Sequence, residues 1–170
     1  MLLHSLHTTL ALAGGLAIAF PLAAQTYGDS TKPQSRPQTF SATLSGTKEV
    51  PQVNTIGSGT ARFTVKNDST ITFDVSLQGV PQVTGAHIHL GAPGAAGAAV
   101  ATLMKGSAPG GRISGTITPK DLHGATMLKL IDAMKSGGAY VNVHTTTHPD
   151  GEVRGEIQPA ESSTLGAVMH

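Results

Sequence analysis

The chain contains no cysteine among its 170 residues. This absence excludes a disulfide framework, a thiolate metal site and a cysteine nucleophile. The protein must therefore be stabilised by its own hydrophobic core, for which a central region of about 120 residues is long enough. The length is that of a single domain with tails at its ends.

Charged and aromatic side chains are both scarce. Charged residues make up 12% of the chain, the formal net charge is +1, and no cluster of Lys or Arg is visible. Because nucleic-acid binding needs a basic surface, we expect no nucleic-acid partner. Aromatic residues amount to 4%, whereas there are 21 Gly and 10 Pro. This composition, with frequent Thr and Val, predicts short strands joined by tight turns.

A long apolar run lies near the N-terminus. It spans residues 10–24 and ends with Pro21 and the small residues Ala23 and Ala24. This pattern predicts a secretory signal peptide over residues 1–24, and hence a periplasmic or secreted protein. The residues before the run contain no Lys or Arg, which departs from the usual pattern. An uncleaved anchor is the alternative, but the run is short for a membrane span, so we expect no membrane contact after cleavage.

The rest of the chain divides into a linker, a domain and a tail. Residues 25–38 hold Pro33 and Pro37 among polar side chains, and they are predicted to form a flexible linker. A regular alternation of apolar and polar residues then extends over residues 39–159 and marks the domain. Residues 160–170 form a short tail that is predicted to be disordered.

Alternating hydrophobicity within the domain predicts strands, because successive side chains of a strand point to opposite faces. One segment has a different period. Its apolar residues recur at helical spacing, which predicts a short helix over residues 126–135 that ends at Gly137 and Gly138. The expected strands are residues 40–45, 61–66, 70–78, 84–91, 100–104, 112–118, 139–145 and 152–158.

Residues 84–91, Thr-Gly-Ala-His-Ile-His-Leu-Gly, form the chemically richest segment. On a strand, Ala86 and Ile88 line one face while His87 and His89 share the other. Two histidines at positions i and i+2 have Cα atoms roughly 6–7 Å apart, so both rings can bind one metal ion. A single pair is weak evidence, and two solvent-facing histidines on an amphipathic strand are the alternative interpretation.

A third histidine has the same orientation on a later predicted strand. In residues 139–145, Val141 and Val143 point one way, whereas Tyr140, Asn142 and His144 point the other. If this strand lies beside the His-x-His strand, three imidazoles meet on one sheet face.

Three imidazoles on a rigid sheet predict a site for copper, with zinc as the alternative, because these ions favour nitrogen ligands. Glu152 or Asn142 could orient one of the rings through a hydrogen bond. The alternative is a polar, partly exposed sheet face whose side chains only form hydrogen bonds. The predicted metal ligands, the last of them as a fourth ligand or a lid, are His87, His89, His144 and His148.

Three motifs occur in the order that is typical of the CHRD (chordin-type) domain. They are Phe40-Ser-Ala-Thr-Leu-Ser-Gly with Glu49-Val-Pro, Ala86-His-Ile-His-Leu-Gly, and Tyr140-Val-Asn-Val-His-Thr followed by His148-Pro-Asp-Gly-Glu-Val-Arg-Gly-Glu-Ile. The chain resembles this family over residues 39–159. The resemblance implies a secreted β-sandwich domain, and the bacterial members mostly have no assigned function.

The histidine motifs also resemble the copper site of copper–zinc superoxide dismutase. By motif, His87 and His89 match that family's copper pair, and His144 matches its late copper ligand. Together the two resemblances imply an all-β fold, a Greek-key antiparallel β-sandwich of the superoxide-dismutase or immunoglobulin type with one short α-helix. The likeness is incomplete. Residues 91–99 contain no His or Asp where that family has its zinc loop, and Arg154 is the nearby candidate for its anion-guiding arginine.

Three functions remain open on the sequence alone. The first is a secreted or periplasmic protein that binds a copper-type ion through the three histidines. The second is an extracellular interaction domain that binds an extracellular or periplasmic protein without a metal. The third is a redox enzyme similar to superoxide dismutase, against which the missing zinc loop counts. We expect a binding protein rather than an enzyme, and no Gly-x-Ser-x-Gly motif indicates a hydrolase.

Overall fold

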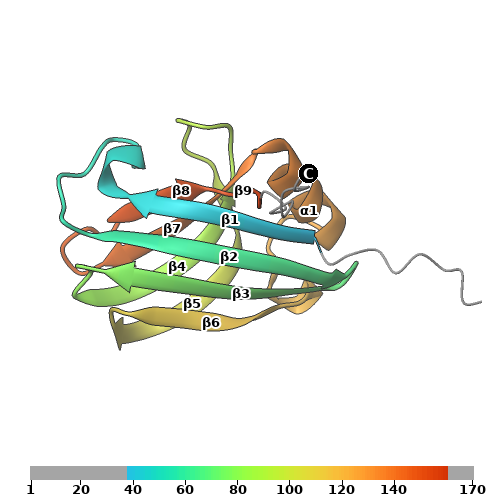
Figure 1. Ribbon diagram of the computed structural model, residues 1–170, viewed down its shortest axis with the longest axis horizontal. Helices are drawn as coiled ribbons and strands as arrows, with labels where there is room; N and C mark the ends of the chain where they lie inside the picture. Colours follow the sequence, from blue (N-terminus) through green and yellow to red (C-terminus); the bar gives the residue numbers. More distant parts are fainter. Residues whose placement is uncertain (1–37, 161–170) are drawn as a thin grey trace, which may run out of the picture. The chain divides into compact units, whose positions relative to one another are not determined.

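The computed structural model describes residues 38–160 (Figure 1). The signal peptide predicted over residues 1–24 lies outside the described residues, as does the predicted linker up to residue 37 and the predicted tail from residue 161. Gln38, which the sequence pattern assigns to the linker, is instead the first residue of a strand. No helix within residues 38–160 is long and apolar enough to cross a membrane.

All eight predicted strands are present, and a ninth, short strand follows them. The strand β5 extends well beyond its predicted end at residue 104, because its later residues continue to pair with β4. The elements are β1 (Gln38–Ser45), η1 (Gly46–Lys48), β2 (Ser58–Asn67), β3 (Thr70–Gln78), β4 (Gln82–Leu90), β5 (Ala98–Pro109), β6 (Arg112–Ile117), η2 (Pro119–Asp121), α1 (Met127–Ser136), β7 (Ala139–Thr145), β8 (Val153–Glu156) and β9 (Gln158–Pro159).

The strands pair antiparallel in the order β5-β4-β7-β8-β1-β2-β3-β6, with β9 beside β1. This sheet folds into two layers. In Figure 1, β1, β2, β3 and β6 form the front layer, and β4, β5 and β7 lie behind it. The layers connect where β8 meets β1, through the pair Ser45 and Arg154. The predicted Greek-key antiparallel β-sandwich with one short helix is confirmed.

Apolar side chains from both layers meet in one core. Phe40 on β1, Phe63 on β2 and Val75 on β3 are buried from the front layer, and Ile88 on β4 and Val141 on β7 from the other. Each of these residues belongs to an alternating series, so the polar residues between them point away from the core. Burying such a side chain contributes roughly 1.5–3 kcal/mol. The core therefore fixes which face of β4 and β7 carries the histidines.

The helix α1 covers one end of the sandwich and confirms the predicted helix. The Thr126 side chain accepts a hydrogen bond from the Lys129 backbone N–H at 3.2 Å, which begins the helix. Gly137, with φ of 72°, ends it in the left-handed conformation that glycine adopts most easily. The side chains of α1 that are buried recur at helical spacing and are Met127, Leu130, Ile131 and Met134.

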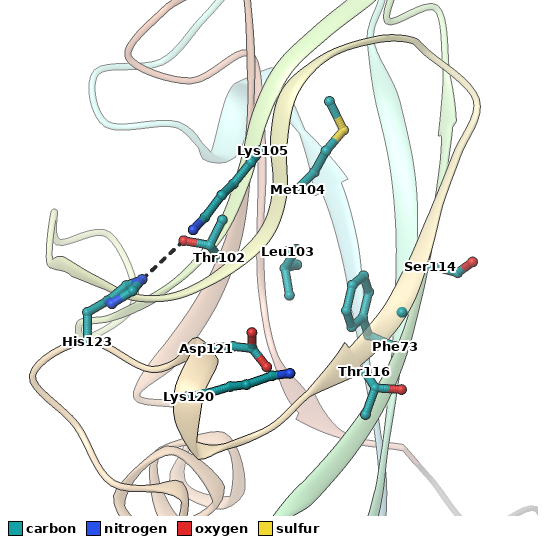
Figure 2. A pocket seen from close by; sticks show the side chains of 11 residues that line it. Phe73, Thr102, Leu103, Met104, Lys105, Ser114, Thr116, Lys120, Asp121 and His123 are labelled. Atoms are coloured by element: carbon teal, nitrogen blue, oxygen red, sulfur yellow. Dashed lines mark hydrogen bonds between the residues drawn. The ribbon is translucent and has the colours of Figure 1, made fainter.

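The strands β5 and β6 do not pair with each other, although a tight turn joins them. A pocket of about 310 Å³ lies between them and is lined by Phe73 (Figure 2). Two of its polar side chains already have partners. Asp121 accepts hydrogen bonds from the backbone N–H and hydroxyl of Thr118, and His123 contacts the Thr102 hydroxyl at 3.3 Å. The sandwich is thus an almost closed barrel with one opening.

The packing of α1 predicts a contrast between two leucines. Leu130 is fully buried, whereas Leu128 is 60% exposed on the same helix. We expect Leu130→Ala to lower the free energy of unfolding by about 2–5 kcal/mol, because it leaves a cavity in the core. Leu128→Ala is the matched control and is expected to change that free energy by at most about 0.5 kcal/mol. Denaturant unfolding measures both, and equal effects would contradict the assigned orientation of α1.

Candidate metal centre

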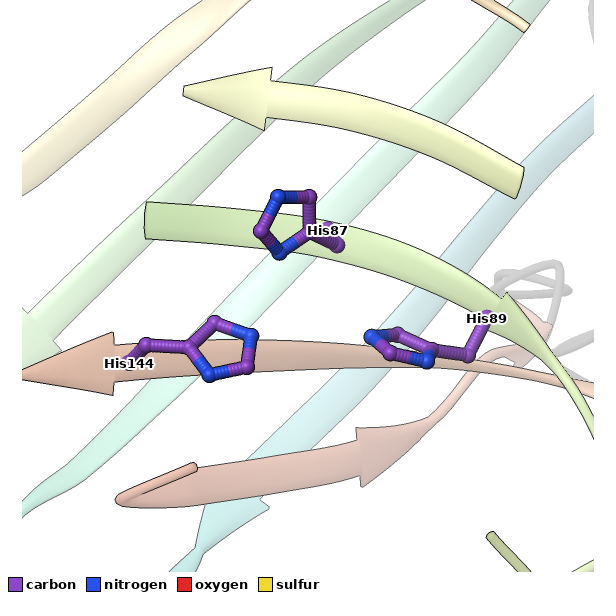
Figure 3. Close-up of side chains that lie close together, drawn as sticks. All are labelled: His87, His89 and His144. Carbon is purple, nitrogen blue, oxygen red and sulfur yellow. The ribbon is translucent and has the colours of Figure 1, made fainter. Parts of the chain in front are cut away.

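The three predicted histidine ligands meet because β4 and β7 are neighbours in the sheet. In the antiparallel register, His89 lies opposite Tyr140, His87 opposite Asn142, and Gly85 opposite His144. The imidazole centroids are 5.0 Å apart between His87 and His144, 6.1 Å between His87 and His89, and 6.4 Å between His89 and His144. One potential ligand atom from each ring lies within 4.8 Å of the others (Figure 3).

The pairing of β4 with β7 is regular across the site, whereas the pairing of β4 with β5 is not. From Gly85 to Leu90, β4 pairs with β7 without a shift of register. Against β5, the register shifts between Ala86 and His87 and again between Ile88 and His89. In both cases the extra residue belongs to β5. The irregularities therefore leave the relative positions of the histidine-bearing strands undisturbed.

Gly85 provides the space that the rings of His87 and His144 occupy. A Cβ atom at this position would lie 3.2 Å from Cε1 of His87 and 3.7 Å from Cδ2 of His144. A Cβ atom would thus contact both rings and would require the His87 ring to shift by a few tenths of an ångström. The glycine in the Thr-Gly-Ala-His-Ile-His segment is thus part of the site.

Hydrogen bonds fix the tautomers of two of the rings. Nδ1 of His89 lies 2.9 Å from the Gly97 carbonyl oxygen, and Nδ1 of His144 lies 2.9 Å from the Pro149 carbonyl oxygen. Because a carbonyl oxygen only accepts, both Nδ1 atoms donate, and each Nε2 carries the free lone pair. Both Nε2 atoms are buried without a hydrogen-bond partner. A buried, unpartnered lone pair is costly unless a further group binds it, and this is the arrangement that metal ligation requires.

Burial also favours the neutral imidazoles that bind metal. The pKa of His87 is lowered, first by its burial and then by the neighbouring His144 and His89. The pKa of His89 is lowered by burial, an effect that the hydrogen bond to Gly97 partly opposes. Metal binding requires deprotonated imidazole, so the lowered pKa values of His87 and His89 favour the form of these two rings that binds a metal.

The polar residues beside the histidines are buried rather than partly exposed. Tyr140, Asn142, Glu152 and Arg154 are each less than 5% exposed. Tyr140, Asn142 and Arg154 follow the predicted alternation along β7 and β8, whereas Glu152 precedes β8 and accepts a hydrogen bond from Thr145 on the core-facing side of β7. The sequence pattern did not reveal that chain segments outside these strands, among them the one that contains Glu49, would enclose them.

Neither Glu152 nor Asn142 orients a histidine ring, contrary to the expectation from sequence. Glu152 accepts hydrogen bonds from the hydroxyls of Thr55, at 2.8 Å, and Thr145, at 2.6 Å. The Asn142 amide donates to both carboxylate oxygens of Glu49, at 2.8 and 3.0 Å. Backbone carbonyl groups orient the rings of His89 and His144 instead. A sequence pattern does not show which backbone group a side chain will contact.

Glu49 lies next to the site. The strand pattern did not predict its contact with Asn142, although Glu49 belongs to the Glu49-Val-Pro motif. It is 7% exposed and forms a buried pair with Asn142. Burial raises the pKa of its carboxyl to about 7, and the nearby Arg154 opposes this rise.

His148 lies apart from the other three histidines. Among residues 38–160, the group with metal-binding geometry contains only His87, His89 and His144. The backbone N–H of His148 donates to the Thr145 hydroxyl, at 3.1 Å. Its side chain lines a separate groove of about 490 Å³ that also includes exposed Ile56. The structure therefore gives no support to His148 as a fourth ligand.

The lowered pKa values predict how His87 and His89 titrate in the metal-free protein. We expect NMR titration midpoints below the ordinary histidine value of 6.5 for both residues. The unfolded chain then takes up protons at higher pH than the folded chain, so these two residues lower the free energy of unfolding as the pH falls through 6.5. The raised pKa of Glu49 changes the free energy of unfolding with pH in the opposite direction. A measurement of overall stability would therefore mix these contributions, and residue-specific NMR is the appropriate measurement. Midpoints at or above 6.5 would contradict the described burial.

Comparison with known proteins identifies the family. The family model of the CHRD domain matches residues 40–157, which is most of the chain and contains most of β1, all of β2 to β8 and every residue of the histidine cluster. No curated protein matches the chain. This match confirms the resemblance to the CHRD domain that the sequence motifs indicate. The chain therefore belongs to the CHRD domain family.

Proposed function

We propose that this protein is a periplasmic or secreted CHRD-domain protein that binds a copper-type metal ion through His87, His89 and His144. Membership of the CHRD family suggests an extracellular domain with a role in protein interaction. The observation that carries the metal proposal is the pair of buried, unpartnered Nε2 atoms on His89 and His144, which belong to the three-histidine cluster.

The chemistry of the three ligands restricts the metal. Neutral imidazoles suit Cu(I), Cu(II) and Zn(II), whereas Mg(II) and Ca(II) prefer oxygen ligands. Three protein ligands leave a coordination position for an exogenous ligand, and all three histidines are only partly buried. Such a site fits the sensing, buffering or delivery of a metal ion.

Titration of the metal-free protein with Cu(II) and Zn(II) tests this function. We expect one ion per chain, with copper bound more tightly than zinc, in agreement with the general order of affinities. His87→Ala and His144→Ala are each expected to weaken binding by at least about tenfold, because loss of a ligand costs more than loss of an outer hydrogen bond. Calorimetry or competition with a chromophoric chelator measures the affinities.

Two other histidines serve as matched controls. His123→Ala removes an exposed imidazole in the opening between β5 and β6, and His148→Ala removes one in the separate groove. Both variants are expected to bind the metal as the unchanged protein does. If all four substitutions have the same small effect, the three-histidine cluster is not a metal site. If His148→Ala alone weakens binding, the ligand set is different from the one proposed.

A metal-independent interaction domain is the second candidate function. Ile56 is 91% exposed and lines the groove that also contains Val80 and Pro81, and Val50, in the same connection between η1 and β2, is 45% exposed. Exposed apolar side chains beside a groove are typical of protein-binding surfaces. This function would be supported if Ile56→Asp abolished binding to an extracellular protein that His87→Ala still binds.

A further inference from the structure

The candidate ligand His89 belongs to a stack of three planar groups, in which Tyr140 and Arg154 follow its ring. The rings of His89 and Tyr140 are 4.8 Å apart between centroids and inclined by 13°. Cζ of Arg154 lies 3.4 Å from the centroid of the Tyr140 ring. Because β4 and β8 flank β7 on opposite sides, His89 and Arg154 contact opposite faces of the Tyr140 ring. The guanidinium is therefore one aromatic ring away from the imidazole.

Hydrogen bonds connect this stack to the segment of residues 91–97. The Tyr140 hydroxyl accepts the Gly97 backbone N–H at 3.0 Å, and the Gly97 carbonyl oxygen accepts the Nδ1–H of His89. Nη1 of Arg154 donates to the Ala95 carbonyl oxygen at 2.9 Å. The same stack thus holds both the plane of the His89 ring and the carbonyl that fixes its tautomer.

The charge of Arg154 is buried and incompletely balanced. The side chain is 2% exposed, and its Nε and Nη2 atoms have no hydrogen-bond partner. Glu156 lies 3.6 Å from Nε, but it also pairs with Lys48 at 3.8 Å, so two cations share one carboxylate. The pKa of the nearby Glu49 carboxyl is raised to about 7, so this group does not supply a full negative charge at neutral pH.

We propose that Tyr140 and Arg154 are positioning residues for His89, and that the buried Arg154 cation biases the three-histidine site toward Cu(I) over divalent copper and zinc. This inference rests on the metal-binding function proposed above. A fixed positive charge repels a divalent ion more strongly than a monovalent ion at the same place. Three neutral imidazoles add no charge that would cancel the difference. At an effective dielectric constant of about 20, one unit charge two stacking layers away changes the preference on the order of tenfold.

The test measures the ratio of Cu(I) to Cu(II) affinity in competition with chromophoric chelators specific for each oxidation state. Arg154→Gln removes the charge, and we expect it to lower this ratio by about tenfold. Arg154→Lys keeps the charge and is the matched control, with a ratio within about threefold of that of the unchanged protein. A purely structural role of Arg154 would weaken the binding of both ions equally and leave the ratio unchanged, which would overturn the proposal.

Glu156→Gln provides a second test with the opposite sign. Glu156 is 19% exposed, so its substitution is tolerated more easily than that of buried Arg154. Removing this carboxylate leaves more positive charge beside the site, and we expect the ratio of Cu(I) to Cu(II) affinity to rise by several-fold. An unchanged or lowered ratio would overturn the electrostatic proposal even if Arg154→Gln does not fold.

The positioning role of Tyr140 is tested by comparing two substitutions. Tyr140→Phe keeps the stacked ring and removes the hydroxyl that accepts the Gly97 N–H, so the Cu(II) absorption and electron paramagnetic resonance spectra are expected to change less than those of Tyr140→Leu. Tyr140→Leu removes the ring, and we expect altered spectra because His89 is no longer held in one plane. Identical spectra for both variants would exclude this role. If the unchanged protein binds no copper, the proposed function fails; if it binds copper but these variants change nothing, only this inference fails.

Discussion

The antiparallel pairing of β4 with β7 is the contact on which the candidate site depends. It brings two histidines from one strand and one from another onto a common face, with continuous register from Gly85 to Leu90. The opposite face of both strands is held in the core by Ile88 and Val141, which are fully buried. Because a slip of one residue would exchange the two faces of a strand, core packing and ligand geometry are specified by the same register.

The second determinant of the site is the enclosure of polar groups that a sheet face would normally expose to water. Tyr140 and Arg154 are buried beside the histidines, and Arg154 donates to the carbonyl oxygen of Ala95. The segment of residues 91–97 has no side chain that could bind a metal, yet its backbone contacts His89, Tyr140 and Arg154. A chain segment of small residues thus acts through its peptide groups, which approach the buried rings more closely than larger side chains would allow.

Much of this arrangement follows from short-range sequence patterns. The alternation of apolar and polar residues predicted β1 to β8, and the common parity of His87, His89 and His144 predicted that they share a face. Two features required the three-dimensional structure. The alternation along the strands could not predict whether His148 joins the other three histidines, because His148 lies between β7 and β8. The structure places it in a different groove. The burial of Arg154 depends on segments distant in sequence, and no periodicity within β8 reveals it.

The irregular border between β4 and β5 has a consequence for where this chain can take up additional residues. The strand β5 already accommodates extra residues beside Ala86 and Ile88 while the pairing of β4 with β7 remains regular from Gly85 to Leu90. An insertion or deletion in β5 is therefore expected to change this edge of the sheet without rotating a histidine of β4. From Gly85 to Leu90 the border with β7 has no such irregularity, and one residue added to β7 before His144 would turn that imidazole toward the core. Engineered insertions are accordingly expected to be tolerated in β5 and to disrupt the histidine cluster when placed in β7.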